Sequence, residues 1–116
     1  MSVPTLTLAD FLLARIAEDE EVAQAAASAV GRPLIDYHLD LAEARHIARW
    51  DPARVLAECE AKRRIVEHHS SSGDDWPLCA ICTEVGPDAQ GWPCLTLLLL
   101  ALPYSDHGDY REEWRP

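Results

Sequence analysis

Three cysteines in the second half of the chain have the residue type and spacing of a metal site. Cys79 and Cys82 form a C-x-x-C pair, and Cys94 follows after eleven intervening residues. Structural zinc is bound by four ligands arranged as a tetrahedron, most often thiolate sulfur and imidazole nitrogen. The two-residue gap lets both sulfurs of the pair face one ion, and Cys94 stands where the next apolar stretch begins. These residues predict a zinc site with one further ligand.

The fourth ligand is expected from the segment that precedes the C-x-x-C pair. His68 and His69 end a helix-like stretch a few residues earlier, and either can complete a site of three cysteines and one histidine. Cys59 is the other candidate, but it lies on the apolar side of that stretch, where cysteine behaves as a small hydrophobic side chain. Four protein ligands leave no open coordination position, so we expect the zinc to be structural rather than catalytic.

Other chemistries for these residues have weaker support. A disulfide or redox pair is the main alternative for the C-x-x-C, but it favours a βαβ setting that the sequence does not show. Zinc deaminases carry H-x-E followed by P-C-x-x-C, whereas here Leu78 separates Pro77 from Cys79. Phosphate-binding glycine loops, G-x-S-x-G and H-E-x-x-H are missing from the sequence. We therefore expect a non-enzymatic protein without catalytic residues. Three isolated histidines are expected at the surface or the edge of the core: His38, His46 and His107.

A long helix is predicted for the N-terminal part of the chain. Thr7 and Asp10 have the spacing of an N-cap and the third helical residue, and Gly31 with Pro33 would end the helix. Apolar residues recur at helical spacing and predict the side that faces the core. The predicted stripe comprises Leu8, Phe11, Leu12, Ile16, Val22, Ala23 and Ala26.

The polar faces of this helix carry Arg15 and the acidic run 18–21. The run has the residue types of a metal site, but neighbouring residues on a helix point in different directions. It therefore predicts a solvated helix face.

Two more helices are predicted before the C-x-x-C pair. The first is short and covers residues 41–50. The second begins after Asp51, an N-cap residue, with Pro52 at its first position, and it runs to residue 68 or 69. Residues 34–39 alternate apolar and polar types and predict one short strand or hairpin.

A short, almost entirely apolar helix is predicted after Cys94, followed by a tail of polar and aromatic residues. Asp106 or Asp109 would cap one last helical turn. The tail has two interpretations: it packs back to cover the core, or it forms an exposed aromatic and acidic docking strip for a partner. Its aromatic residues are Tyr104, Tyr110 and Trp114.

Length and charge limit the classes of function. The 116 residues, 48% of them hydrophobic, predict a single domain (1–116) with a small core that benefits from a staple. The formal net charge of −10 disfavours general binding to nucleic acid or anionic membranes. The N-terminus lacks the features of a secretory signal, and the longest apolar run, 95–103, is far shorter than the roughly 20 residues that span a bilayer. We expect a cytoplasmic protein that does not associate with membranes.

The charge is unevenly distributed along the sequence. Residues 41–69 hold six basic and five acidic residues, whereas the other 87 residues hold four basic and fifteen acidic ones. A nucleic-acid-binding regulator that uses the basic stretch 45–64 is therefore the alternative function. This hypothesis gains weight if the basic side chains share an exposed face, and loses weight if they pair with nearby acids. The run 62–64 also suits the negative end of a helix dipole.

Two blocks of the sequence resemble a known family. The segments "HIARWDPARVLAECEAKRRIVEHH" (46–69) and "WPCLTLLLLALPYSDHGDYREEWRP" (92–116) are similar to blocks of an uncharacterised family of small actinobacterial and phage-borne proteins. That family is labelled only as a domain of unknown function. Relative to it, the segment 31–40 is shortened, and Leu98 with Leu99 replaces more polar residues, which suggests an additional packing surface.

The resemblance sharpens the predicted site and leaves the role open. It implies that the three cysteines match family cysteines, and that the histidine closing the helix is His69 rather than His68. We therefore predict a mainly α fold, a small helical domain whose C-terminal half is stapled by a zinc knuckle of Cys79, Cys82, Cys94 and His69. The predicted function is a zinc-stabilised, non-enzymatic interaction or regulatory module with a protein partner, of the mobile-element origin that the resemblance implies.

Overall fold

The structure, a computed structural model, describes residues 6–28, 40–69, 79 and 93–116. It is mainly helical, as predicted, and the described residues form no strand. The strand predicted for 34–39 and the helix end predicted at Gly31 and Pro33 lie outside the described residues. The elements are α1 (Leu8–Ser28), α2 (Leu41–Arg49), α3 (Pro52–His68), α4 (Leu95–Ala101) and the short 3-10 helices η2 (Leu102–Tyr104) and η3 (Glu112–Trp114).

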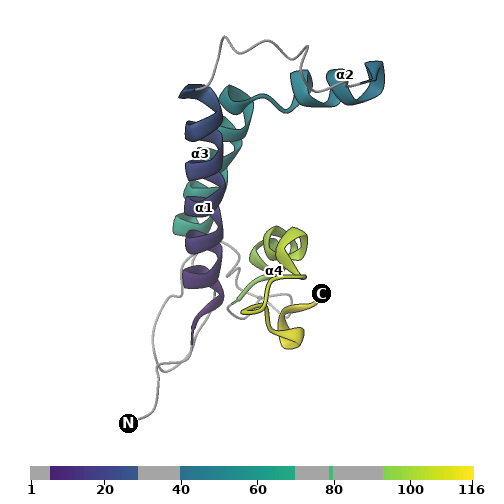
Figure 1. The fold of residues 1–116 in the computed structure, drawn as a ribbon. Coiled ribbons are helices and arrows are strands. Elements are labelled where there is room, and N and C mark those ends of the chain that lie inside the picture. Colours follow the sequence, from purple (N-terminus) through teal and green to yellow (C-terminus); the bar gives the residue numbers. More distant parts are fainter. Residues whose placement is uncertain (1–5, 29–39, 70–78, 80–92) are drawn as a thin grey trace.

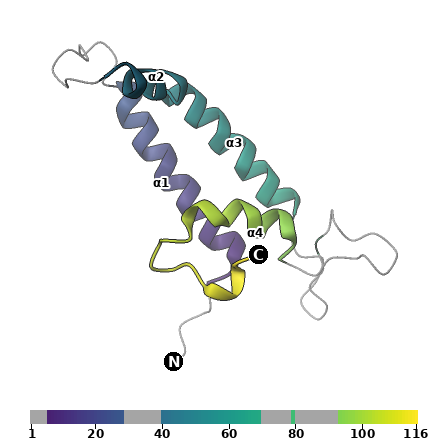
Figure 2. The ribbon, with the colours of Figure 1, turned by 90° about the vertical axis from the view of Figure 1, so that its right-hand side faces the viewer.

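An antiparallel pair of helices forms the frame of the molecule. α1 and α3 lie side by side along their length, whereas α2 extends away from one end of the pair (Figure 1). α4 crosses the opposite end, close to the start of α1 (Figure 2). The two ends of the pair are therefore covered differently. In the part of the chain that the structure describes, no helix has both the length and the apolar character needed to cross a membrane.

Side-chain caps fix the starts of the first three helices. Thr7 Oγ1 accepts a hydrogen bond from the backbone N–H of Asp10 at 3.1 Å, which confirms the predicted start of α1. Asp40 and Asp51 accept in the same way at the starts of α2 and α3, at 2.8 and 2.9 Å. Each cap satisfies a backbone donor that the helix itself leaves unpaired. The predicted boundaries of α2 and α3 therefore agree closely with the structure.

The core is centred on Phe11, which has no exposed surface. Aromatic side chains of the C-terminal segment surround its ring in edge-to-face and tilted arrangements. The ring centroids lie 5.1 Å away for Trp114, 6.0 Å for Tyr110 and 6.4 Å for Tyr104. Such aromatic pairs contribute beyond their buried area. The tail therefore covers the core, which confirms the first of its two predicted interpretations.

Arg15 is buried, although the sequence placed it on a polar face of the helix. Only 8% of the residue is exposed. Its guanidinium donates two hydrogen bonds to Glu18, at 2.6 and 3.0 Å, and lies over the Phe11 ring at 5.1 Å. A third guanidinium nitrogen lies 3.1 Å from His107 Nδ1. Burial is possible because all three guanidinium nitrogens have a polar partner and the cation lies over an aromatic ring.

The acidic run 18–21 is also less solvated than predicted. The Tyr104 hydroxyl donates a 2.7 Å hydrogen bond to Asp19, which links the end of η2 to α1. Glu20 forms an ion pair with Arg63 of α3. These contacts hold neighbouring elements together, whereas Glu21 is exposed and forms no ion pair with the described residues.

Val22 and Ala26 are exposed, contrary to their predicted place in the apolar stripe. Val22 is 72% exposed, whereas Ala23 next to it is 5% exposed. The difference arises because α4 and the tail cover only the first half of α1. Beyond Ile16, only the side of α1 that faces α3 is buried.

Two predictions for the C-terminal segment need correction or refinement. η3 begins after Arg111 without a side-chain cap, so the prediction that Asp106 or Asp109 caps the last turn is wrong. Leu98 packs against the core, whereas Leu99 is 50% exposed.

The Phe11 core predicts a large effect of Phe11→Ala. We expect this substitution to lower the free energy of unfolding by about 3–5 kcal/mol, because a buried ring is replaced by a cavity. Chemical denaturation measures the change. The control is Gln24→Ala, at an exposed position of the same helix, which should change stability by less than about 0.5 kcal/mol. Equal effects of the two substitutions would contradict the assignment of the core.

Candidate metal centre

Three potential metal ligands meet where α3 ends and α4 begins. His69 is the C-cap residue of α3, and its backbone N–H donates to Ile65. Cys94 is the N-cap residue of α4 and makes no side-chain capping hydrogen bond. Cys79 comes from the chain between the two helices. The helix ends therefore place a histidine and a cysteine that are 25 positions apart next to each other.

The geometry of this cluster fits a tetrahedral metal ion. His69 Nδ1 lies 3.2 Å from Cys79 Sγ and 3.3 Å from Cys94 Sγ, and the three potential ligand atoms all lie within 4.8 Å of one another. With usual zinc bond lengths, a nitrogen and a sulfur on one tetrahedral ion are separated by roughly 3.6 Å. Both cysteines are buried, at 0% and 1% exposure. The group can therefore hold a metal ion.

Hydrogen bonding alone accounts poorly for these contacts. Nδ1 of His69 has either one proton or one lone pair in the plane of its ring. It can therefore make only one well-directed hydrogen bond, yet two sulfur atoms approach it at nearly equal distances. The arrangement of the three atoms is compatible with one shared metal ion.

The other predicted ligands have different positions. Cys82 lies outside the described residues. His68 is exposed and does not belong to the group, although it is adjacent to His69 in the chain. Cys59 lies in the interior between α1 and α3, apart from the group, in agreement with its interpretation as a core side chain. Within the described part of the chain, no disulfide involves Cys59 or Cys94.

Asp19 and Tyr104 are partly buried and hydrogen-bonded to each other, and the charge of Asp19 also acts on the buried Cys59. Burial, the hydrogen bond to Asp19 and the negative charge of that carboxylate raise the pKa of Tyr104 well above its usual range. Burial, followed by the charge of Asp19, also raises the pKa of the Cys59 thiol. Cys59 is therefore held as a neutral thiol, which is a poor nucleophile. The sequence could not reveal this contact, because Asp19 and Tyr104 are 85 positions apart.

Many of the basic side chains of the 45–64 stretch are neutralised by acids. Arg54 pairs with Glu58 at 3.1 Å, and Arg64 pairs with Glu60 at 3.0 Å. Arg63 pairs with Glu20, as described above. The stretch therefore does not form a continuous basic face.

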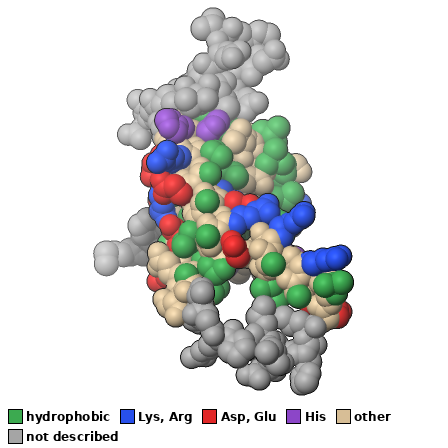
Figure 3. All heavy atoms as spheres, turned by 90° about the horizontal axis from the view of Figure 1, so that it is seen from above, with side chains coloured by type: hydrophobic (Ala, Val, Ile, Leu, Met, Phe, Trp, Pro, Cys, Tyr) green, Lys and Arg blue, Asp and Glu red, His purple; other side chains and the backbone are tan. Residues whose placement is uncertain are grey.

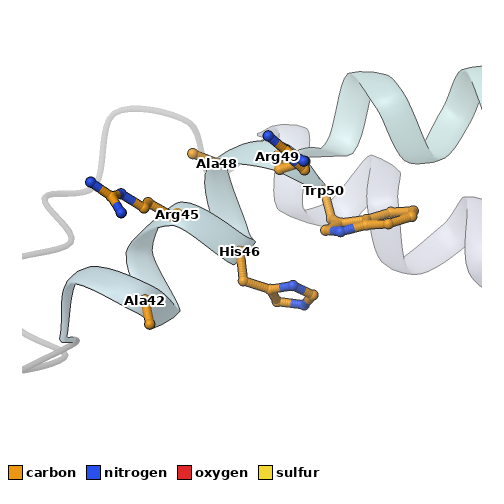
Figure 4. Close-up of a pocket in the computed structure, with 6 residues that line it drawn as sticks. All are labelled: Ala42, Arg45, His46, Ala48, Arg49 and Trp50. Atoms are coloured by element: carbon orange, nitrogen blue, oxygen red, sulfur yellow. The ribbon is translucent and has the colours of Figure 1, made fainter.

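The hollows around α2 hold no cysteine. One of them is lined by Ala42, Arg45, His46, Ala48, Arg49 and Trp50 (Figure 4). It lies at the opposite end of the helical pair from α4 (Figures 1 and 2). An enzyme with a cysteine nucleophile needs a reactive thiol beside its substrate pocket, and the position of this hollow gives that interpretation no support.

A family model for a family of unknown function, DUF6221, matches residues 5–116. The chain belongs to the DUF6221 family. The match confirms the family resemblance of the sequence and extends over all four helices, the three-residue cluster and the C-terminal tail of the DUF6221 chain. Comparison with curated proteins and with solved structures found no match. The function of this DUF6221 member must therefore be argued from its own residues.

The environment of Cys59 predicts low reactivity in the folded DUF6221 protein. We expect iodoacetamide at mildly alkaline pH to alkylate Cys59 much more slowly in the native protein than in denaturant, because the raised pKa and burial suppress the accessible thiolate. Mass spectrometry of peptides locates the label, and a Cys59→Ser variant verifies the assignment. Rapid labelling of Cys59 in the native protein would be incompatible with this environment.

Proposed function

We propose that this protein is a small non-enzymatic interaction module whose fold depends on one structural zinc ion. The observation that carries the proposal is the group of His69, Cys79 and Cys94, in which both cysteines are buried and the ligand atoms are close enough to share one tetrahedral ion. Thiolate and imidazole ligands favour zinc over the hard cations, which prefer oxygen.

We assign the fourth position to Cys82. The support is its spacing from Cys79, because a C-x-x-C pair turns both sulfurs toward one ion. A site of three cysteines and one histidine then has no position for water or substrate. This saturated coordination is the reason for proposing a structural rather than a catalytic ion.

The ion would stabilise the fold by joining the end of α3 to the start of α4. His69 ends α3 and Cys94 precedes α4, so one ion fixes the place at which the chain returns to the helical pair. From there α4 and the tail cover Phe11. Binding energy that is available only in this arrangement becomes folding energy.

The zinc proposal predicts the metal content of variants. We expect about one zinc per chain in the wild type, and loss of zinc in His69→Ala and Cys94→Ser, because each removes one ligand. His68→Ala and Cys59→Ser are matched controls that should retain it, since both side chains lie outside the group. Elemental analysis of protein purified without chelators measures the content. Wild-type protein without metal would refute the proposal, and metal loss only in a control would refute the ligand assignment.

Removal of zinc should lower the thermal midpoint of unfolding. We expect a strong chelator to produce this shift in the wild type and in His68→Ala, with each kcal/mol of lost stability lowering Tm by roughly 4 °C. Calorimetry with and without re-added zinc tests reversibility. An unchanged Tm after verified removal of the metal would show that the ion does not support the fold.

A nucleic-acid-binding regulator is the second candidate function. It is favoured by Arg45 and Arg49 on α2, which are exposed and have no ion pair among the described residues. Three factors oppose it: the net charge of −10, the paired arginines of α3, and the lack of net positive charge in a zinc site with three thiolates.

We therefore expect negligible binding to duplex DNA at physiological salt. A gel-shift titration with unrelated DNA and DNA from the native host measures it. Tight binding that weakens steeply with salt would instead support the second candidate, because phosphate contacts release counterions. Loss of that binding in Arg45→Ala and Arg49→Ala, but not in Arg64→Ala, would place the contact on α2.

A further inference from the structure

Helix α2 is short, with nine residues, and none of them is buried in the part of the chain that the structure describes. Ala44 is partly buried, whereas Leu41 is 66% exposed and Ile47 is 42% exposed. Isolated helices of this length are marginal in water, and most helices in proteins are stabilised by packing of an apolar face. The helix therefore lacks the contact that usually stabilises such an element.

The residues of α2 divide into an apolar stripe and a basic side. At 100° per residue, the apolar stripe contains Leu41, Ala44, Ile47 and Ala48. Arg45 and Arg49 lie one turn apart on the neighbouring side. The helix is therefore complementary to an apolar surface that is bordered by acidic residues.

A hollow of about 310 Å³ lies between α2 and the adjoining ends of α1 and α3. Most of the residues that line it are apolar, and they include the exposed Val22 and Trp50. On the face of Figure 3, which looks down on the molecule, hydrophobic side chains are interspersed with basic and acidic ones. The hollow is lined by Asp19, Val22, Ala23, Ala26, Ile47, Trp50, Pro52 and Val55.

Acidic residues of α1 accompany this apolar surface. Asp19 lines the hollow, and Glu21 is exposed on the same helical segment, whereas Glu18 is already paired with Arg15. The charge of this segment is opposite to that of Arg45 and Arg49 on α2. One chain therefore carries both an unpartnered basic amphipathic helix and an apolar surface flanked by acids.

We propose that two copies of this chain form a symmetric dimer in which the exposed apolar stripe of α2 in each copy packs into the hollow that α1, α2 and α3 line in the other. A two-fold axis makes both complementary contacts at once, since each copy supplies one helix and one hollow. The mode of contact is an amphipathic helix laid against an apolar groove. This inference goes beyond the zinc site, and it does not depend on that site because the surface lies at the opposite end of the helical pair.

Sedimentation equilibrium of the full-length, metal-containing protein over a wide concentration range tests the proposal. We expect a reversible monomer–dimer equilibrium that Ile47→Asp and Arg49→Glu each weaken by about thirtyfold or more, as for central interface residues. The matched controls are Leu99→Asp, at a similarly exposed apolar position on α4, and Arg64→Glu on α3. Both should dimerise like the wild type.

Hydrogen exchange supplies a second readout that does not depend on variants. We expect the amides of α2 to become more protected as protein concentration rises, because dimerisation covers the helix. A wild-type protein that stays monomeric at every concentration would overturn the proposal, as would a dimer that survives both test substitutions. If the monomer gains α2 protection only on phosphatidylglycerol vesicles or on DNA, that surface replaces the second copy as the partner.

Discussion

The packing of the C-terminal rings around Phe11 is the contact on which the rest of the fold depends. Two antiparallel helices can bury only the side on which they touch, and α1 has a second apolar side in its first half. The aromatic residues of the tail cover that side and leave Phe11 without exposed surface. Polar contacts at the edge of this aromatic cluster then fix the position of the tail. Tyr104 donates to Asp19, and His107 lies beside the buried guanidinium of Arg15. The candidate metal centre lies at the beginning of the same covering segment, where α4 starts.

The two ends of the helical pair consequently have different character. At one end, aromatic packing and the His69, Cys79 and Cys94 group bring the chain back over the core. At the other end, α2 and the last turns of α1 expose Leu41, Val22 and Trp50 to solvent. The end that carries α4 and the candidate metal centre fits a structural role. The end that carries α2 has the exposed apolar surface, which can contact another molecule. This separation places the proposed staple and the proposed interaction surface on different parts of the chain.

Local signals in the sequence predicted the helices well. Thr7, Asp51 and Pro52 determine helix starts through contacts within one turn, so neighbouring residues are sufficient to recognise them. The cysteine and histidine types also led to a cluster that the structure brings together in part, with Cys82 outside the described residues.

Contacts between distant segments were harder to predict. Arg15 has the type of a surface residue, and it is buried where the tail brings His107, 92 positions away, beside its guanidinium. Val22 has the type and period of a core residue, but none of the described elements covers it. In both cases tertiary packing, which no short window of sequence contains, decided the outcome.

The order of contacts along the chain has a consequence for biosynthesis. The partners of α1 in the tail are among the last described residues to be synthesised: Tyr104 lies 85 positions after Asp19, and His107 lies 92 positions after Arg15. A ribosome releases α1 long before it releases the rings that cover Phe11. Until then, the apolar side of α1 stays open to solvent, to chaperones and to other nascent chains. Complete burial of the first helix must therefore wait for nearly the whole chain, and a chain truncated before the tail would leave Phe11 uncovered.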